Sequence, residues 1–100
     1  MYASIRQYRA SDTEELVRRV RQGFVPVVRK VPGFSDHYVI DSGGGVFTTV
    51  TVGLDQTGVE ESVTKAREWV RDNAADLIEG APTVTSGEVV AHTRLRPSVM

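Results

Sequence analysis

Three consecutive glycines separate two alternating segments of this chain, and this arrangement constrains the fold more than any other feature. Residues 46–54 are rich in Val, Thr and Phe, a composition typical of a β-strand. Residues 34–41 alternate in the same way on the other side of Ser42-Gly43-Gly44-Gly45. A glycine-rich link this short between two strands predicts an antiparallel hairpin.

A helical segment precedes the hairpin. Ser11 with Glu14, or Asp12 with Glu15, has the spacing of a capping box, and an apolar stripe at helical spacing follows from residue 16 to residue 31. Gly23 weakens this helix, and Pro26 bends or interrupts it because it lacks a backbone donor.

A second helical segment follows the hairpin. Thr57 and Glu60 have capping-box spacing, and the apolar stripe from Val59 reaches Leu77, with Ile78 and Trp69 at its edges. Gly80-Ala81-Pro82 then predicts the end of this helix.

Residues 2–9 and 83–91 read as the first and fourth strands. The order strand, helix, strand, strand, helix, strand predicts an α+β fold of the ferredoxin-like βαββαβ type. Such a fold is a four-stranded antiparallel sheet with both helices on one face. We expect one domain over residues 1–92 and a C-terminal tail over residues 93–100.

Composition excludes several classes of protein. The net charge of -1 lacks the basic excess typical of nucleic-acid binders. No segment approaches the roughly 20 apolar residues of a membrane span, and the N-terminus lacks a signal-peptide pattern. The absence of cysteine removes disulfides and thiolate chemistry. His37 and His92 are too far apart to suggest a metal site. We expect a cytoplasmic protein without nucleic-acid, membrane or metal partners.

The alternation also predicts the two faces of the sheet. On the first strand, we expect Ala3 and Ile5 to pack beneath the helices. On the second and third strands, we expect the same of the most apolar residues, which are Phe34, Tyr38, Ile40, Val46, Val50, Val52 and Leu54. The opposite face then has no helix to cover it. A second copy of the chain is the economical partner for that face, so we expect a homodimer formed face to face.

The chain resembles a known family in three features. These are the βαββαβ order, the segment Val31-Pro32-Gly33-Phe34 that enters the second strand, and the third strand followed by Asp55 and a capped helix. Over roughly residues 2–92 it is similar to the antibiotic biosynthesis monooxygenase superfamily. The resemblance implies a dimeric α/β barrel with a lumen. It also implies a small-molecule substrate, and in one branch of the family an oxygenase chemistry that forms quinones without a cofactor.

In the haem-degrading branch of that family, an asparagine, a tryptophan and a histidine carry the chemistry. Arg6 stands at the asparagine position, Gly53 lies near the tryptophan position, and the second helical segment contains no histidine. The resemblance therefore does not extend to haem degradation.

Three residues are candidate catalytic groups. His37 has an ordinary pKa of about 6.5, which suits a general base. Arg6 is a candidate for polarising a substrate oxygen, and Tyr8 for orienting a ring. Each also has a structural interpretation: an edge or dimer-contact histidine, an arginine paired with Asp36 or Glu88, and a tyrosine that supplies interface area.

Five further residues are expected to bind a ligand in the lumen, namely Tyr2, Phe47, Thr49, Thr51 and Trp69. For Trp69, packing of the second helix is the competing interpretation. Two functions remain open at this level. One is a small cofactor-independent monooxygenase that acts on an aromatic or polyketide-like compound. The other is a non-catalytic dimeric ligand-binding or stress-related protein.

Overall fold

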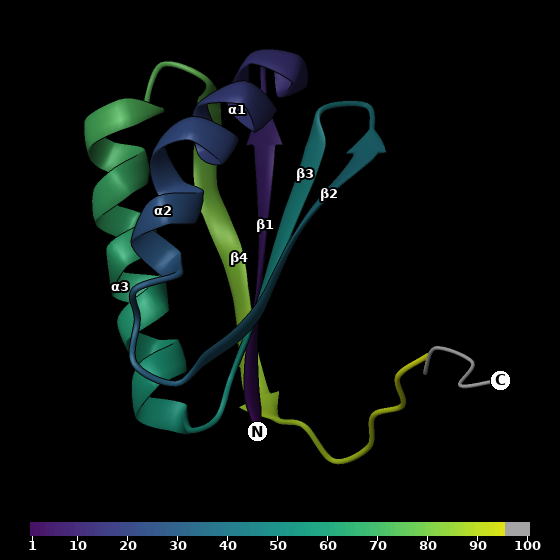
Figure 1. The fold of residues 1–100 in the computed structure, drawn as a ribbon. Coiled ribbons are helices and arrows are strands. Elements are labelled where there is room, and N and C mark those ends of the chain that lie inside the picture. Colours follow the sequence, from purple (N-terminus) through teal and green to yellow (C-terminus); the bar gives the residue numbers. More distant parts are fainter. Residues whose placement is uncertain (96–100) are drawn as a thin grey trace, which may run out of the picture.

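The computed structural model describes residues 1–95 and has the expected order of elements. These are β1 (Tyr2–Ala10), α1 (Thr13–Arg19), a π-helix η1 (Val20–Phe24), α2 (Val25–Val28), β2 (Phe34–Gly43), β3 (Val46–Gly53), α3 (Gln56–Asn73) and β4 (Ile78–Glu88). The strands form one antiparallel sheet in the order β2-β3-β1-β4. All helices cover one face of this sheet, and the other face is bare (Figure 1). The ferredoxin-like fold is confirmed.

The assignment of the two sheet faces was wrong for most residues, although Phe34 packs against the core as expected because the register shifts between Phe34 and Asp36. Residues 4, 6 and 8 of β1 and residues 47, 49 and 51 of β3 are buried. Ile5, Tyr38 and Ile40, expected in the core, are 44%, 54% and 45% exposed and lie on the bare face. The large rings of Tyr8 and Phe47 explain the difference, because they fill the layer between sheet and helices together with α1 and η1 side chains. β-Branched residues fit either face of a strand, so their enrichment did not identify the core.

The first helical segment is divided into three parts. Asp12 caps α1 and accepts a hydrogen bond from the Glu15 amide at 3.1 Å, as the second of the two capping registers predicted. The chain then widens into the π-turn, where the Val25 amide donates to the Val20 carbonyl. Pro26 follows in the first turn of α2, where its missing amide proton costs little. A Cβ at Gly23 would lie 2.9 Å from the indole Nε1 of Trp69, so this glycine lets α3 approach η1 closely.

The bounds of the second helix also differ from expectation. Asp55, rather than Thr57, caps α3 and accepts from the Gly58 amide at 2.9 Å. The helix ends at Asn73, so Leu77 lies in the connection and Ile78 begins β4.

Gly80-Ala81-Pro82 does not end a helix but lies inside β4. The register there shifts between Gln7 and Arg9, which forms a bulge opposite Tyr8. Because β4 is an edge strand, a proline and a bulge are tolerated in it.

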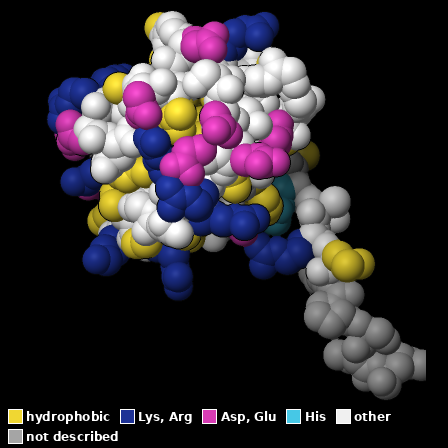
Figure 2. All heavy atoms as spheres, turned by 90° about the horizontal axis from the view of Figure 1, so that it is seen from above, with side chains coloured by type: hydrophobic (Ala, Val, Ile, Leu, Met, Phe, Trp, Pro, Cys, Tyr) yellow, Lys and Arg dark blue, Asp and Glu magenta, His cyan; other side chains and the backbone are white. Residues whose placement is uncertain are grey.

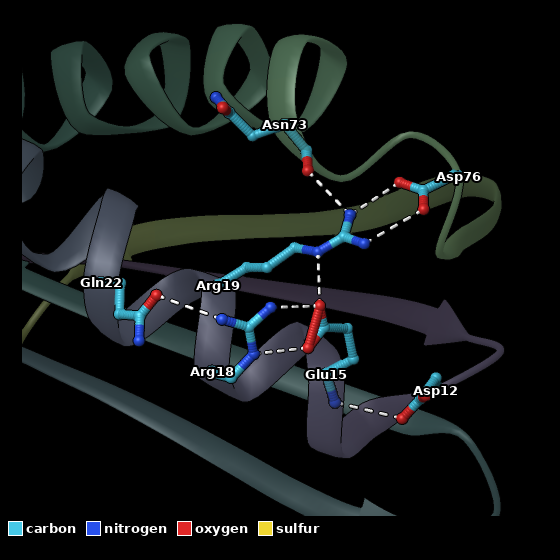
Figure 3. Close-up of polar contacts among 7 residues, drawn as sticks. All are labelled: Asp12, Glu15, Arg18, Arg19, Gln22, Asn73 and Asp76. Carbon is cyan, nitrogen blue, oxygen red and sulfur yellow. Dashed lines mark hydrogen bonds and ion pairs between the residues drawn. The ribbon is translucent and has the colours of Figure 1, made fainter.

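Charged side chains join α1 to the end of α3. Arg19 donates to Asp76 and to the Asn73 carbonyl, and it shares Glu15 with Arg18 (Figure 3). Hydrogen bonds from both arginines hold the pKa of Glu15 at about 2. Basic and acidic groups are interspersed on this end of the molecule (Figure 2). The arrangement is therefore a solvated ion-pair network and not a continuous basic patch.

The sequence predicts a C-terminal tail over residues 93–100. Residues 93–95 have no helix or strand, and residues 96–100 lie outside the described residues. The domain boundary at residue 92 stays a prediction.

Candidate functional site

A buried arginine marks the centre of the inner sheet face. Arg6 lies in β1, one of the two interior strands, opposite Thr49 of β3 and Val84 of β4, and only 2% of it is exposed. Inward alternation places its side chain under the helices. Burial lowers the pKa of Arg6, but an arginine stays protonated in proteins. The site therefore holds a permanent buried cation.

Neutral groups hold this cation. Arg6 Nε donates to Thr49 Oγ1 at 3.0 Å, Nη1 to the Ser62 carbonyl at 3.2 Å and Nη2 to Thr51 Oγ1 at 3.4 Å. The guanidinium carbon lies 5.6 Å from the centre of the Phe24 ring, a cation–π distance.

No carboxylate within residues 1–95 forms an ion pair with Arg6. The structural pairings considered from the sequence are absent inside this chain: Asp36 accepts a hydrogen bond from Ser35, and Glu88 lies opposite Tyr2. A guanidinium forms up to five hydrogen bonds, and the three observed leave donors for an anion.

Two buried polar atoms beside Arg6 have no partner among the described residues. They are Ser4 Oγ and His37 Nε2. The strand pairing Ser4–Thr51–His37 places them in one row across the inner face, next to the row of Arg6 and Thr49. Buried polar groups without partners are rare in folded proteins, and they mark a place where water or a ligand binds.

His37 is held as a neutral ring. Its Nδ1 lies 2.9 Å from Thr51 Oγ1, and its ring packs against Phe24 with the ring centres 5.5 Å apart. Desolvation, assisted by the positive charge of Arg6, lowers the pKa of His37 to about 4. At neutral pH the ring can accept a proton, but it is a weaker base than an ordinary histidine.

This pKa predicts how acid affects stability. In the unfolded chain His37 protonates near pH 6.5, whereas in the folded chain it protonates near pH 4. Between these values the unfolded state binds more protons, so the free energy of unfolding falls as the pH falls. The shift corresponds to at most about 3 kcal/mol, and partial exposure to solvent reduces the expected loss to about 1–2 kcal/mol.

Urea denaturation at several pH values measures this loss. We expect His37→Gln to remove it, so that the wild-type and variant curves converge as the pH falls from 6.5 to 4. Parallel curves would show that His37 titrates normally in the folded protein. The comparison cancels the contributions of Glu15 and Asp76, whose lowered pKa values act equally in both proteins.

Tyr8 completes the site as a protonated phenol. Burial raises its pKa, while the charges of Arg6 and Arg67 act in the opposite direction. The hydroxyl therefore remains a hydrogen-bond donor at neutral pH and lies within the field of both guanidinium groups. The ring meets Phe47 edge to face, with the ring centres 6.2 Å apart.

Two hollows that share part of their lining adjoin these residues. An inner pocket of about 20 Å³, enough for one water, is lined by residues that include Arg6, Tyr8, Phe47, Thr49 and Trp69. A cleft of about 250 Å³ shares Arg6 and Tyr8 with this pocket and is lined by side chains of α3 and β4. A small-molecule ligand therefore has room in the cleft but not in the inner pocket.

The structure brings most of the predicted site residues together. Arg6, Tyr8, Phe47, Thr49 and Trp69 line one pocket, and Thr51 and His37 adjoin it through hydrogen bonds. They meet beneath the helices instead of on the bare face.

Tyr2 is not part of this group. It lies at the start of β1, opposite Gly53 and Glu88, and it lines neither the inner pocket nor the cleft. Sequence reasoning missed Phe24, Ser62 and Arg67. Phe24 belongs to an apolar stripe, and nothing in the pattern distinguishes Arg67 from the other charges of α3.

Within residues 1–95, no three His, Asp or Glu side chains gather closely enough to hold a metal ion. No helix in the same range has both the length and the hydrophobicity needed to span a membrane.

Comparison with known proteins identifies the fold alone. No family model and no curated protein sequence matches the chain. Among solved structures, NE2512, a protein of unknown function from Nitrosomonas europaea, aligns with a TM-score of 0.76 and 17% identity over 96% of this chain and 95% of that chain.

Two similar structures are described as oxygenases. The monooxygenase encoded by ActVA-Orf6 of Streptomyces coelicolor, solved with nanaomycin D, has a TM-score of 0.70 and 16% identity over 97% of this chain and 92% of that one. SnoaB of Streptomyces nogalater, a cofactor-independent oxygenase, has a TM-score of 0.63 and 13% identity over 96% and 97%.

Proposed function

We propose that this chain, which has the fold of the antibiotic biosynthesis monooxygenases, is a small cofactor-independent monooxygenase of aromatic or polyketide-like compounds. The observation that carries the proposal is Arg6, a buried cation without a carboxylate partner in residues 1–95, at the wall of an apolar cleft. Shared fold supports the proposal without deciding it, because one fold hosts many activities.

The proposed reaction begins with an acidic phenol or enol. Arg6 stabilises the oxyanion that forms when the substrate loses its proton, and this lowers the substrate's own pKa. His37 Nε2, which has no other partner among the described residues, accepts that proton. The weak basicity of His37 is then matched to an acidified substrate.

The electrons for oxygen activation come from the substrate anion. A phenol and O₂ yield a quinone and water: one oxygen atom enters the ring and the other leaves as water. Tyr8 donates a hydrogen bond that orients the ring, while Phe47, Thr49 and Trp69 shape the wall around it. Thr51 holds Arg6 and His37 in place through hydrogen bonds. Tyr2 has no role in this proposal, because it lines neither hollow and its hydroxyl forms no hydrogen bond with Arg6, Tyr8 or His37.

Oxygen uptake with 1,5-dihydroxynaphthalene, a phenol of two fused rings, as the probe substrate tests the proposal. We expect enzyme-dependent formation of the quinone, and we expect Arg6→Gln to slow it by about 100-fold, the usual effect of removing an oxyanion donor. Arg9→Gln is the matched control. This substitution removes the same charge from the same strand, but Arg9 is exposed. Equal rates for the two variants, or oxidation no faster than without protein, would reject the monooxygenase assignment.

The bare sheet face supports a homodimer as part of the proposal. Strand pairing aligns Tyr38, Val50 and Ile5 in one row across β2, β3 and β1. Ile5 and Tyr38 are both exposed. An exposed apolar row of this kind is typical of an interaction surface, and a two-fold dimer buries it with one self-complementary contact.

Light scattering at micromolar concentration tests the dimer. We expect twice the chain mass of 11.0 kDa for the wild type, and the mass of a single chain for Ile5→Glu because a charge would be buried without a partner. Leu54→Glu is the control: Leu54 is exposed and apolar but lies after β3, outside the row. A wild-type protein with the mass of one chain would contradict the dimer.

The small inner pocket favours a second function, that of a non-catalytic ligand-binding or stress-related protein. With about 20 Å³ free, the inner pocket has room for a water but not for a substrate ring, so a ligand would bind in the outer cleft without entering the inner pocket. Ligand binding without oxygen uptake in the assay above would identify this alternative.

A further inference from the structure

The cleft between α3 and β4 has an unusual composition for a surface hollow. Most of its lining is apolar, including Val63 and Val70 of α3 and Val84 of β4. Its polar groups are Arg6, Tyr8 and Arg67, and none of its described lining residues is acidic. The walls of the cleft are therefore mostly apolar, and both charged side chains that line it are positive.

The positive charges of Arg6 and Arg67 both act on the hydroxyl of Tyr8. Arg6 is buried, lines the cleft and has no carboxylate partner among residues 1–95. Arg67 lies on the exposed side of α3 and also lines the cleft. An anionic group beside the Tyr8 hydroxyl would thus meet two guanidiniums and one O–H donor.

We infer that this cleft binds a small aromatic carboxylate, with the ring between the valines and the carboxylate between Arg6, Arg67 and Tyr8. The inference rests on the proposed function, because it names the class of molecule that enters the site. The volume of about 250 Å³ limits the ligand to one or two fused rings, since drug-sized ligands need about 300–1,000 Å³. The anion supplies the counter-charge that Arg6 lacks.

Calorimetry with 1-naphthoate and 1-naphthamide tests the inference, because the two probes share a ring and differ in charge. We expect naphthoate to bind about tenfold more tightly, the effect of roughly 1.4 kcal/mol from charge-assisted hydrogen bonds. Trp69 is the sole tryptophan, and it lines the adjoining pocket. Its indole signal in a proton–nitrogen correlation spectrum should shift with naphthoate and so locate the binding.

The Arg67→Gln variant tests whether the carboxylate of the ligand contacts Arg67. The variant should lose about fivefold in naphthoate affinity, the effect of one exposed charge, and should bind naphthamide unchanged. Lys65→Gln is the control: it removes the same charge from α3, but Lys65 lines a different hollow beside α2.

The possible outcomes separate the two proposals. Equal affinity for the two probes, or equal effects of Arg67→Gln and Lys65→Gln, would overturn the anion site and leave the proposed aromatic ligand intact. No binding of either probe would count against both. Naphthoate binding that leaves the Trp69 signal unmoved would place the ligand elsewhere and overturn the inference.

Discussion

Replacing Arg6 by methionine is expected to make the protein more stable while it abolishes catalysis. A buried charge without a partner costs several kcal/mol of desolvation, and hydrophobic replacement of buried ions is often stabilising by 1–4 kcal/mol in other proteins. Methionine is flexible enough to fill the same space. The Thr49 and Thr51 hydroxyls and the Ser62 carbonyl all lose the guanidinium as a donor, although Thr51 keeps its hydrogen bond with His37, and together these losses cost about 1–2 kcal/mol. We therefore expect a net gain of about 1 kcal/mol in the free energy of unfolding.

Urea denaturation and quinone formation measure the two effects on the same protein. Catalysis should fall by about 100-fold or more, because methionine offers no donor to an oxyanion. Arg9→Met is the control and should change stability by less than about 0.5 kcal/mol, since Arg9 is exposed. A destabilised Arg6→Met protein would mean that the arginine is retained as a structural hydrogen-bonding hub.

Replacing Gly58 by alanine is expected to destabilise the protein by about 2 kcal/mol, although alanine is the better helix former by roughly 1 kcal/mol. Gly58 is buried in the first turn of α3, and its amide donates to the Asp55 cap. An added Cβ would lie 2.4 Å from the Pro32 carbonyl oxygen. That oxygen belongs to the backbone before β2, so it cannot rotate away, and the start of α3 must move.

Thermal denaturation checks this expectation. A loss of about 2 kcal/mol lowers the melting temperature of a domain of this size by roughly 8–16 °C. Gly87→Ala is the matched control, because a Cβ at Gly87 meets nothing within 4 Å. If Gly58→Ala melted at or above the wild-type temperature, the close approach of α3 to Pro32 would be wrong.

The order and type of the elements were predictable because they depend on local pattern. Alternation identified the strands, and the glycines of residues 43–45 all have positive φ in the turn of the β2–β3 hairpin. The interruption near Pro26 was also expected. The end of α3 was not, because the apolar residues Leu77 and Ile78 continue a helical stripe while Ile78 already pairs with Ala10 of β1. Strand pairing is a long-range contact that no local spacing reveals.

The candidate site was likewise predictable only in part. From the sequence alone, alternation placed Ser4, Arg6 and Tyr8 on one side of β1, and Phe47, Thr49 and Thr51 on one side of β3. Only the tertiary structure decided that this side lies beneath the helices. Both sides carry enough apolar residues to form a core, so the choice depends on which set fills the space under α1, η1 and α3 and satisfies the buried guanidinium. This choice is a property of packing in three dimensions. The position of Arg67 beside Tyr8 is another, because it depends on how α3 packs on the sheet.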